Sequence, residues 1–282
     1  MKVLQTVEEV KSFLRPQKKE GKSVGLIPTM GFLHEGHLSL IKRAKKENDL
    51  VVVSIFVNPT QFGPNEDFDS YPKDLEKDLA NCEKEGVDVV FHPSVEDMYD
   101  NHLTYIRVEE VSENLCGKTR PIHFQGVATV CNKLFHISFA DRAYFGEKDA
   151  QQLAVLKKMV KDLNMDIILV PCPIVREADG LAKSSRNKYL NDQERKDAVC
   201  LYRGLTRAKE MIAKGVLSKD IIAVIREEID KVPYAKVDYI EVVDQESLQS
   251  VDSVKGDVLV ALAVWIGPAR LIDNFSYTLG EE

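Results

Sequence analysis

An almost unbroken aliphatic run at Leu50–Val57 is the feature of this sequence that most constrains the fold. Runs rich in β-branched residues are typical of a strand that is buried on both faces of a parallel sheet. Similar apolar segments predict further strands at Ser23–Ile27, Val87–Phe91, Arg142–Phe145 and Asp166–Val170. Amphipathic patterns between these segments predict helices at His37–Lys46, Pro72–Gly86 and Ala150–Leu163. This alternation predicts an α/β fold with a Rossmann-like, doubly wound parallel sheet.

The pattern changes beyond residue 175. Arg176–Leu190 is polar, as in a mobile loop or a domain junction. Two helices are predicted next, Asn191–Gly215 with Gly215 at its end, and Ser218–Val232 with Ser218 as its N-cap. Three strand candidates follow at Val237–Val243, Val258–Trp265 and Ala269–Phe275. We therefore expect two domains, a Rossmann-like domain over residues 1–175 and a smaller C-terminal α+β domain over residues 176–282.

Composition excludes several classes of protein. No apolar run approaches the roughly 20 residues of a membrane span. Thr6 and Glu9 form a capping-box pattern at the N-terminus, where an export signal would be apolar, so we expect a cytoplasmic protein. The net charge of −7 disfavours a nucleic-acid partner. The five cysteines include no Cys-x-x-Cys pair, which disfavours a zinc ribbon or a disulfide framework.

The segment Pro28–His37 joins the first predicted strand of the sheet to a helix. It contains His34 and His37, three residues apart, with glycines at Gly31 and Gly36. A helix start offers backbone N–H groups and a positive dipole end to phosphate, and imidazoles can donate to phosphate oxygens. Two other interpretations stay open at this stage. The histidines can be incidental to a helix cap, or they can be two ligands of a metal whose third ligand is elsewhere.

Three more loops border the same edge of the predicted sheet. Asn58–Gly63 carries Gln61, Phe145–Asp149 carries Lys148 behind a glycine, and Lys183–Arg186 combines two cations with two hydroxyls. Each also has a plain structural interpretation: a turn, a helix cap at Asp149, and a solvated loop. The sequence has no P-loop motif, no Gly-x-Gly-x-x-Gly after the first strand and no nucleophile elbow. Together the loops favour nucleotide chemistry of another class.

These loops carry a resemblance to the pantoate–β-alanine ligase family. The resemblance runs from about Val24 to Tyr189 and is looser beyond. The matching stretches are Pro28–His37, Val53–Gly63 with Tyr71-Pro72, Arg120–Val127, Phe145–Gln152, Val175–Gly180 and Ser184–Asn187.

The resemblance implies a reaction. It is the condensation of D-pantoate with β-alanine to pantothenate, a precursor of coenzyme A. ATP is split to AMP and pyrophosphate through a pantoyl-adenylate intermediate. The resemblance also implies a homodimer in which the C-terminal domain is a lid.

It further implies roles for individual residues. His37 and His34 are expected at the catalytic centre with Lys148, and His37 is the family's proposed acid. Gln61 and Gln152 are expected to hold pantoate, and Gln61 also borders the β-alanine site. ATP is expected to contact Met30, Gly31, Phe32, Leu33, His34, Glu35, Gly36, His37, Gly146, Glu147, Lys148, Asp149, Val175, Lys183, Ser184, Ser185 and Arg186.

The resemblance leaves other points to the structure. Mg²⁺ is expected to enter bound mainly to the ATP phosphates, without a metal site of the protein. Lys183 stands where the family usually has Met, and Arg120 is a candidate for the β-alanine carboxylate. The alternative function is a nucleotidyltransferase that moves a nucleotidyl group onto a small phosphate ester. A nucleotide-binding module without activity and a metal-binding protein are weaker alternatives.

Overall fold

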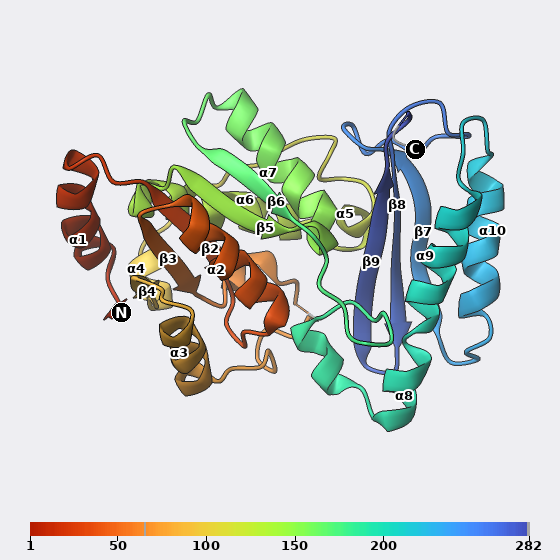
Figure 1. Cartoon of the computed structure of the whole chain (residues 1–282), viewed down its shortest axis with the longest axis horizontal. Coiled ribbons are helices and arrows are strands. Elements are labelled where there is room, and N and C mark those ends of the chain that lie inside the picture. The colour runs from red at the N-terminus through yellow and green to blue at the C-terminus, as the bar shows by residue number, and fades with distance from the viewer. Residues whose placement is uncertain (65, 281–282) are drawn as a thin grey trace. The chain divides into compact units, whose positions relative to one another are not determined.

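The computed structural model describes residues 1–64 and 66–280, which form two compact units (Figure 1). The first unit comprises residues 1–109, 120–147 and 152–173, and the second comprises residues 110–119, 148–151 and 174–282. Two short segments that precede residue 174 therefore belong to the second unit. The buried side chain of Gln151 joins them, since it accepts from the Cys116 N–H at 2.9 Å and donates to the Asn114 carbonyl at 2.6 Å. The single domain boundary expected at residue 175 does not include these two segments in the second domain, and it stays a prediction.

The first unit is built on a six-stranded parallel sheet with the order β1-β4-β3-β2-β5-β6. Its strands are β1 (Lys2–Leu4), β2 (Val24–Thr29), β3 (Leu50–Ile55), β4 (Val89–Phe91), β5 (Arg142–Gly146) and β6 (Ile168–Cys172). The expected α/β fold and its five strands are confirmed, with ends moved by one or two residues. Because chain order reverses at β2, ligands are expected beyond the carboxyl ends of β2, β3 and β5. The short edge strand β1 was not expected.

Helices cover this sheet. They are α1 (Val7–Lys19), α2 (Glu35–Glu47), α3 (Leu75–Lys84), α4 (Val95–Tyr99), α6 (His123–Ser138) and α7 (Ala150–Asp162), with short 3₁₀ turns η1 (Pro59–Gln61) and η2 (Glu147–Asp149). The three expected helices are confirmed as α2, α3 and α7. Helix α6 was missed because it is buried on most sides and has no side-chain cap, so it shows no amphipathic stripe. It passes so close to η1 that a Cβ on Gly126 would lie 2.4 Å from the Thr60 carbonyl oxygen.

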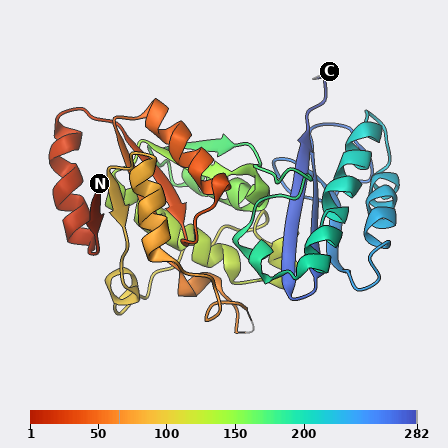
Figure 2. The same cartoon turned by 60° about the horizontal axis from the view of Figure 1, so that its bottom comes forward.

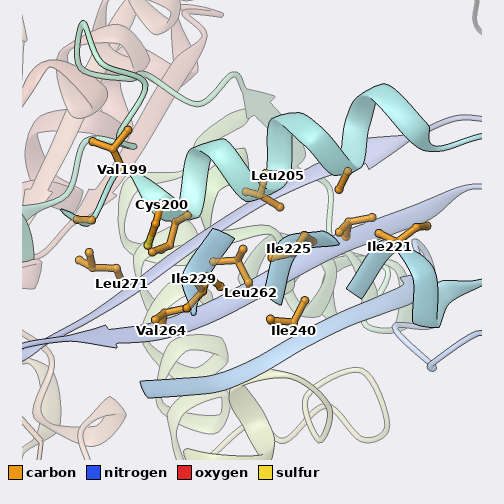
Figure 3. Close-up of a cluster of buried hydrophobic side chains, with 14 of the residues drawn as sticks. Val199, Cys200, Leu205, Ile221, Ile225, Ile229, Ile240, Leu262, Val264 and Leu271 are labelled. Carbon is orange, nitrogen blue, oxygen red and sulfur yellow. The ribbon is translucent and has the colours of Figure 1, made fainter. Parts of the chain in front are cut away.

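The second unit contains a three-stranded antiparallel sheet, as expected. Its strands are β7 (Lys236–Asp244), β8 (Val258–Ile266) and β9 (Ala269–Tyr277), and its helices are α5 (Cys116–Thr119), α8 (Asp192–Asp197), α9 (Cys200–Met211) and α10 (Ser218–Ile229), with the 3₁₀ turn η3 (Ser185–Tyr189). Figure 2 shows α9 and α10 along one face of this sheet. Their apolar side chains form a core with the strands, as Figure 3 shows for Leu205, Ile225 and Leu262.

Two local predictions in this unit are wrong. The single helix expected at Asn191–Gly215 is interrupted after α8, where the Leu201 N–H bonds to the Ala198 carbonyl in a tightened turn. Ser218 is not the N-cap of α10. Leu217 holds that position, and the Ser218 hydroxyl donates to the Val251 carbonyl instead. A tertiary partner thus outcompeted the local cap that propensity favours.

Candidate active site

His34 and His37 cap helix α2 reciprocally. The His34 Nδ1 accepts from the Gly36 N–H at 3.1 Å, and the His37 Nδ1 accepts from the His34 N–H at 3.3 Å. The two ring centroids lie 4.1 Å apart. The helix-cap interpretation is therefore correct for both residues, and it does not exclude a role in anion binding.

This capping sets the tautomer of both imidazoles. A ring nitrogen that accepts from an N–H carries no proton, so the neutral rings are protonated at Nε2. An Nε2–H group donates to a phosphate oxygen but offers no lone pair to a metal. Among residues 1–64 and 66–280, no three His, Cys, Asp or Glu side chains are grouped to hold a metal ion. The geometry favours an anion over a metal at the two histidines.

The backbone amides before α2 are already occupied by side chains. The Gly31 N–H donates to the Thr29 hydroxyl at 3.1 Å. The Phe32 and Leu33 N–H groups donate to the two carboxylate oxygens of Asp78, at 2.7 and 2.6 Å. We expected backbone N–H groups of this loop to be available to phosphate. That expectation is wrong for these three residues, whose N–H groups already donate to side chains. Recognition of an anion here depends more on the imidazoles and the helix dipole.

Asp78 is 1% exposed and reaches this loop from α3. Burial raises the pKa of its carboxyl above the ordinary value, and the N–H groups of Leu33 and Phe32 oppose that rise. Sequence reasoning missed Asp78, because it lies in a charged helix and 41 residues after His37. Only the tertiary structure brings it to the loop.

Gln61 is held beside Met30, at the carboxyl ends of the adjacent strands β3 and β2. Its Oε1 accepts from Asn58 at 3.1 Å, and its Nε2 donates to the Met30 sulfur at 3.1 Å. Asn58 is 1% exposed and is itself fixed by the Tyr99 hydroxyl at 2.7 Å. This network sets which end of the Gln61 amide faces Met30. Sequence reasoning saw Asn58 only as part of a turn.

Arg120 forms a double hydrogen bond with Glu66, at 2.8 and 2.5 Å. Burial favours a higher pKa for the Glu66 carboxyl, but the bonds and charge of Arg120 outweigh it, and the pKa lies below its ordinary value. Since the guanidinium is engaged with Glu66, binding of the β-alanine carboxylate at Arg120 would require an exchange of partners. The expected role of Arg120 stays a prediction.

In the second unit, Lys148 and Ser184 line one small cavity together with Asn187 and Asp273. Two residues expected at the ATP site are thus brought together from distant parts of the chain. The Asn187 Oδ1 is buried and has no hydrogen-bond partner among the described residues, while its Nδ2 donates to the Ala182 carbonyl at 3.1 Å. Such an acceptor fits a bound water or a donor group of a ligand. Sequence reasoning gave Asn187 no role.

Val175 and Lys183 lie at the ends of one hairpin. The Lys183 N–H donates to the Val175 carbonyl at 2.9 Å, and Arg176 bridges to Ala182 within the turn. The Lys183 ammonium pairs with Glu177 at 2.8 Å. Expected nucleotide contacts Val175 and Lys183 are thus adjacent, and much of the extra charge of Lys183 is balanced within the hairpin.

The remaining expected residues are divided between the two units. The first unit holds Met30–His37, Gln61, Gly146, Glu147 and Gln152, and the second holds Lys148, Asp149, Val175 and Lys183–Arg186. Three loops of the first unit leave the carboxyl ends of β2, β3 and β5, as expected from a doubly wound sheet.

A comparison with protein families identifies the family of this chain. The model of the family described as pantoate–β-alanine ligase matches residues 2–276. The chain belongs to the pantoate–β-alanine ligase family. Membership confirms the resemblance found in the sequence, the class of enzyme and the reaction expected from it.

Named relatives agree with this family. The pantothenate synthetase of Caldicellulosiruptor bescii is 58% identical over 278 residues, which is 97% of this chain and 98% of the relative. That of Clostridium novyi is 57% identical over 99% of both chains. The crystal structure of pantothenate synthetase from Thermus thermophilus superimposes with a TM-score of 0.92, at 44% identity over 98% of this chain and 99% of that one.

A structure of pantoate–β-alanine ligase from Francisella tularensis contains βγ-ATP and β-alanine. It superimposes with a TM-score of 0.81, at 38% identity over 98% of this chain and 97% of that one. These ligases share the six-stranded parallel sheet and the small antiparallel sheet of this chain, so the expected fold class is confirmed at the level of whole structures.

Proposed function

We propose that this ligase joins D-pantoate to β-alanine in two steps and splits ATP to AMP and pyrophosphate. The observation that carries the proposal is the match to pantoate–β-alanine ligases from residue 2 to residue 276. The ligand-bound relative, which holds βγ-ATP and β-alanine, supports ATP and β-alanine as substrates of this chain. The geometry of the histidine pair supports a phosphate-binding centre at the start of α2.

In the first step, a pantoate carboxylate oxygen attacks the α-phosphorus of ATP. A new phosphorus–oxygen bond forms, the bond to the β-phosphate oxygen breaks, and pyrophosphate leaves. Like charges repel on this approach by roughly 4 kcal/mol for each unit pair at about 4 Å and an effective dielectric near 20. We assign Lys148, Arg186 and the Nε2–H groups of His34 and His37 to offset this repulsion and to stabilise the charge on pyrophosphate.

Mg²⁺ fits this scheme as a partner of the ATP phosphates. Imidazoles protonated at Nε2 do not bind a metal, and the described part of the chain groups no set of metal-ligating side chains. We therefore expect the ATP phosphates to hold the ion, which would neutralise negative charge there.

Gln61 is assigned to pantoate. Its Nε2 donates to the Met30 sulfur, which is a weak acceptor, so an oxygen of pantoate can replace this contact at little cost. Asn58 holds the other end of the amide and keeps the donor directed at the substrate side. Gln152 is assigned to pantoate by the family resemblance alone.

In the second step, the amine of β-alanine attacks the acyl carbon of pantoyl adenylate. An amide bond forms, the bond to the phosphate oxygen breaks, and AMP leaves. The amine reacts after losing its proton, since its ordinary pKa is about 10. Gln61 borders the β-alanine site in this assignment.

We further propose a cytoplasmic homodimer, on the family resemblance. In the part of the chain that the structure describes, no helix has the length and apolar character needed to cross a bilayer. Light scattering on the purified protein would give the mass of the assembly, and a monomer at micromolar concentration would contradict the dimer.

The decisive experiment is exchange of labelled pyrophosphate into ATP. Exchange should require pantoate and Mg²⁺ and should proceed without β-alanine, because adenylation alone is reversible. Folded protein without such exchange would contradict the adenylate mechanism. Release of pyrophosphate with a phosphate-ester acceptor in place of pantoate would instead support the nucleotidyltransferase alternative.

A further inference from the structure

The carboxylate of Asp78 links helix α3 to the loop that precedes α2. Its two oxygens accept separately from consecutive backbone N–H groups, Leu33 at 2.6 Å and Phe32 at 2.7 Å. The side chain is 1% exposed, so water competes little for these bonds. A buried carboxylate that accepts two backbone donors is a strong and directional support for the loop.

The loop that Asp78 holds has an unfavourable backbone. Gly31 has φ +84° and Phe32 has φ +53°, so two consecutive residues adopt left-handed conformations. Phe32 has a Cβ and does not favour this region, so the conformation persists only where its surroundings impose it. A Cβ on Gly31 would lie 3.1 Å from the Asp78 Oδ2, which leaves little room for any other residue there.

The left-handed turn at Gly31 and Phe32 lies immediately before the segment that contains His34 and His37. Leu33 precedes His34, which is the N-cap of α2, and the amide of His34 in turn donates to His37. The direction of the backbone at Leu33 therefore determines the positions from which the side chains of His34 and His37 extend. A shift of this loop would break the reciprocal cap and remove the reason for protonation at Nε2.

We propose that Asp78 is a positioning residue for adenylation, which holds the turn at Gly31–Leu33 and through it the orientation and tautomer of His34 and His37. Asp78 itself does not need to touch a substrate. The assignment rests on the proposed function for its kinetic consequence only, because the state of the imidazoles can be measured without any reaction.

Asp78→Asn is the sharpest variant. The amide keeps the shape of the side chain but replaces one acceptor oxygen by an NH₂ group, which faces a backbone N–H donor. We expect the turn to loosen and pantoate-dependent adenylation in a single turnover to slow by about 100-fold, the effect of displacing a reacting group by about 1 Å. The KM for ATP should change much less than this rate.

The direct readout is the ¹⁵N spectrum of the imidazoles. The chain has six histidines, so the signals of His34 and His37 can be assigned by single substitutions. In the wild type, both should show Nε2 protonation, and in Asp78→Asn they should move to a mixture of tautomers. If the wild type catalyses no exchange at all, the proposed function fails, and these spectra still test the inference about Asp78.

Asp74→Ala is the matched control. Asp74 is the N-cap of the same helix, and its side chain accepts from the Lys77 N–H of that helix at 3.2 Å. This variant should lose stability through α3 while its imidazole signals and adenylation rate stay unchanged. Equal changes in both variants would overturn the inference, because they would reflect the stability of α3 alone.

A second variant serves if Asp78→Asn does not fold. Adding Phe32→Gly relieves the left-handed strain, because glycine adopts positive φ readily. The double variant should recover part of the native tautomer signals. Folded Asp78→Asn with wild-type signals, or with slow adenylation and unchanged signals, would contradict the positioning role.

Discussion

At the scale of single residues, hydrogen bonds decide what each side chain of the site can do. His34 and His37 accept at Nδ1 in the cap of α2, so their neutral rings carry the proton on Nε2. Gln61 is oriented by Asn58 in the same way. In both cases a hydrogen-bond partner selects the donor that the proposal assigns to a substrate.

His37→Ala should slow adenylation far more than it weakens ATP binding. The imidazole contributes most when charge moves onto pyrophosphate, so we expect a loss of about 100-fold in the single-turnover rate. The dissociation constant for ATP, measured by calorimetry, should change by only a few fold. An unchanged rate would remove His37 from the chemistry. His34→Asn is a useful companion, because asparagine preserves an N-cap without an imidazole.

At the scale of elements, short loops are held by ion pairs within their own unit. The hairpin from Val175 to Lys183 carries the pair of Lys183 with Glu177, and the loop after η1 is tied to the start of α6 by Glu66 and Arg120. These pairs are partly exposed, so each stabilises its loop modestly and depends on salt.

The hairpin pair makes a prediction about ATP affinity. Glu177→Gln leaves the charge of Lys183 unbalanced and should lower the KM for ATP by about threefold, and Lys183→Met should raise it by a similar factor, as expected for one partly screened charge. Opposite shifts would place the hairpin close to the triphosphate. If neither variant changes the KM, the pair only stabilises the hairpin, and the expected role of Lys183 at ATP is wrong.

The Glu66–Arg120 pair predicts a dependence of stability on pH. The pKa of Glu66 in the folded protein lies below its ordinary value of 4.5, so the pair stabilises the fold above that pH. Its contribution should be lost as the pH falls through the folded pKa. Urea denaturation should therefore show a difference between the wild type and Glu66→Gln at pH 7 that shrinks below about pH 4.5. In an Arg120→Gln background, the difference should be small at every pH.

At the scale of the whole molecule, the second unit includes two short segments that interrupt the first unit along the chain. Gln151 is 5% exposed and holds residues of the segment 110–119 within the second unit. Gln152, the next residue, belongs to the first unit and is assigned to pantoate. The proposal thus gives these adjacent glutamines different roles.

Gln151→Ala and Gln152→Ala test this division. Gln151→Ala removes the hydrogen bonds of Gln151 to the backbone of the buried residues Cys116 and Val111 and one of the two bonds to the Asn114 carbonyl, so we expect a loss of about 2–3 kcal/mol in the free energy of unfolding. Gln152→Ala should be nearly as stable as the wild type and should raise the KM for pantoate. The reverse pattern, a stable Gln151→Ala with weak pantoate binding, would contradict the assignment.

Much of the fold was predictable because it depends on local pattern. The aliphatic run at Leu50–Val57 and its counterparts appear as β3 and the neighbouring strands, and the three C-terminal strands lie where the sequence predicted them. Helix α6 was not predicted because a helix that is buried on most sides has no amphipathic stripe in its sequence. The bond of Ser218 to Val251 was not predicted because a partner distant in sequence competed with the local cap. The break after α8 was not predicted because no glycine or proline marks it in the sequence.

The sequence by itself determined the parallel sheet, the loops that carry chemistry and the family, since these depend on hydrophobic period and on motifs contiguous along the chain. Only the tertiary structure decided the tautomer of the two histidines, the support of their loop by Asp78 and the inclusion of residues 110–119 and 148–151 in the second unit. The support by Asp78 and the placement of those segments depend on contacts between residues far apart in the sequence, which no local pattern records. The tautomers depend on short-range cap bonds whose geometry exists only once the loop before α2 is folded.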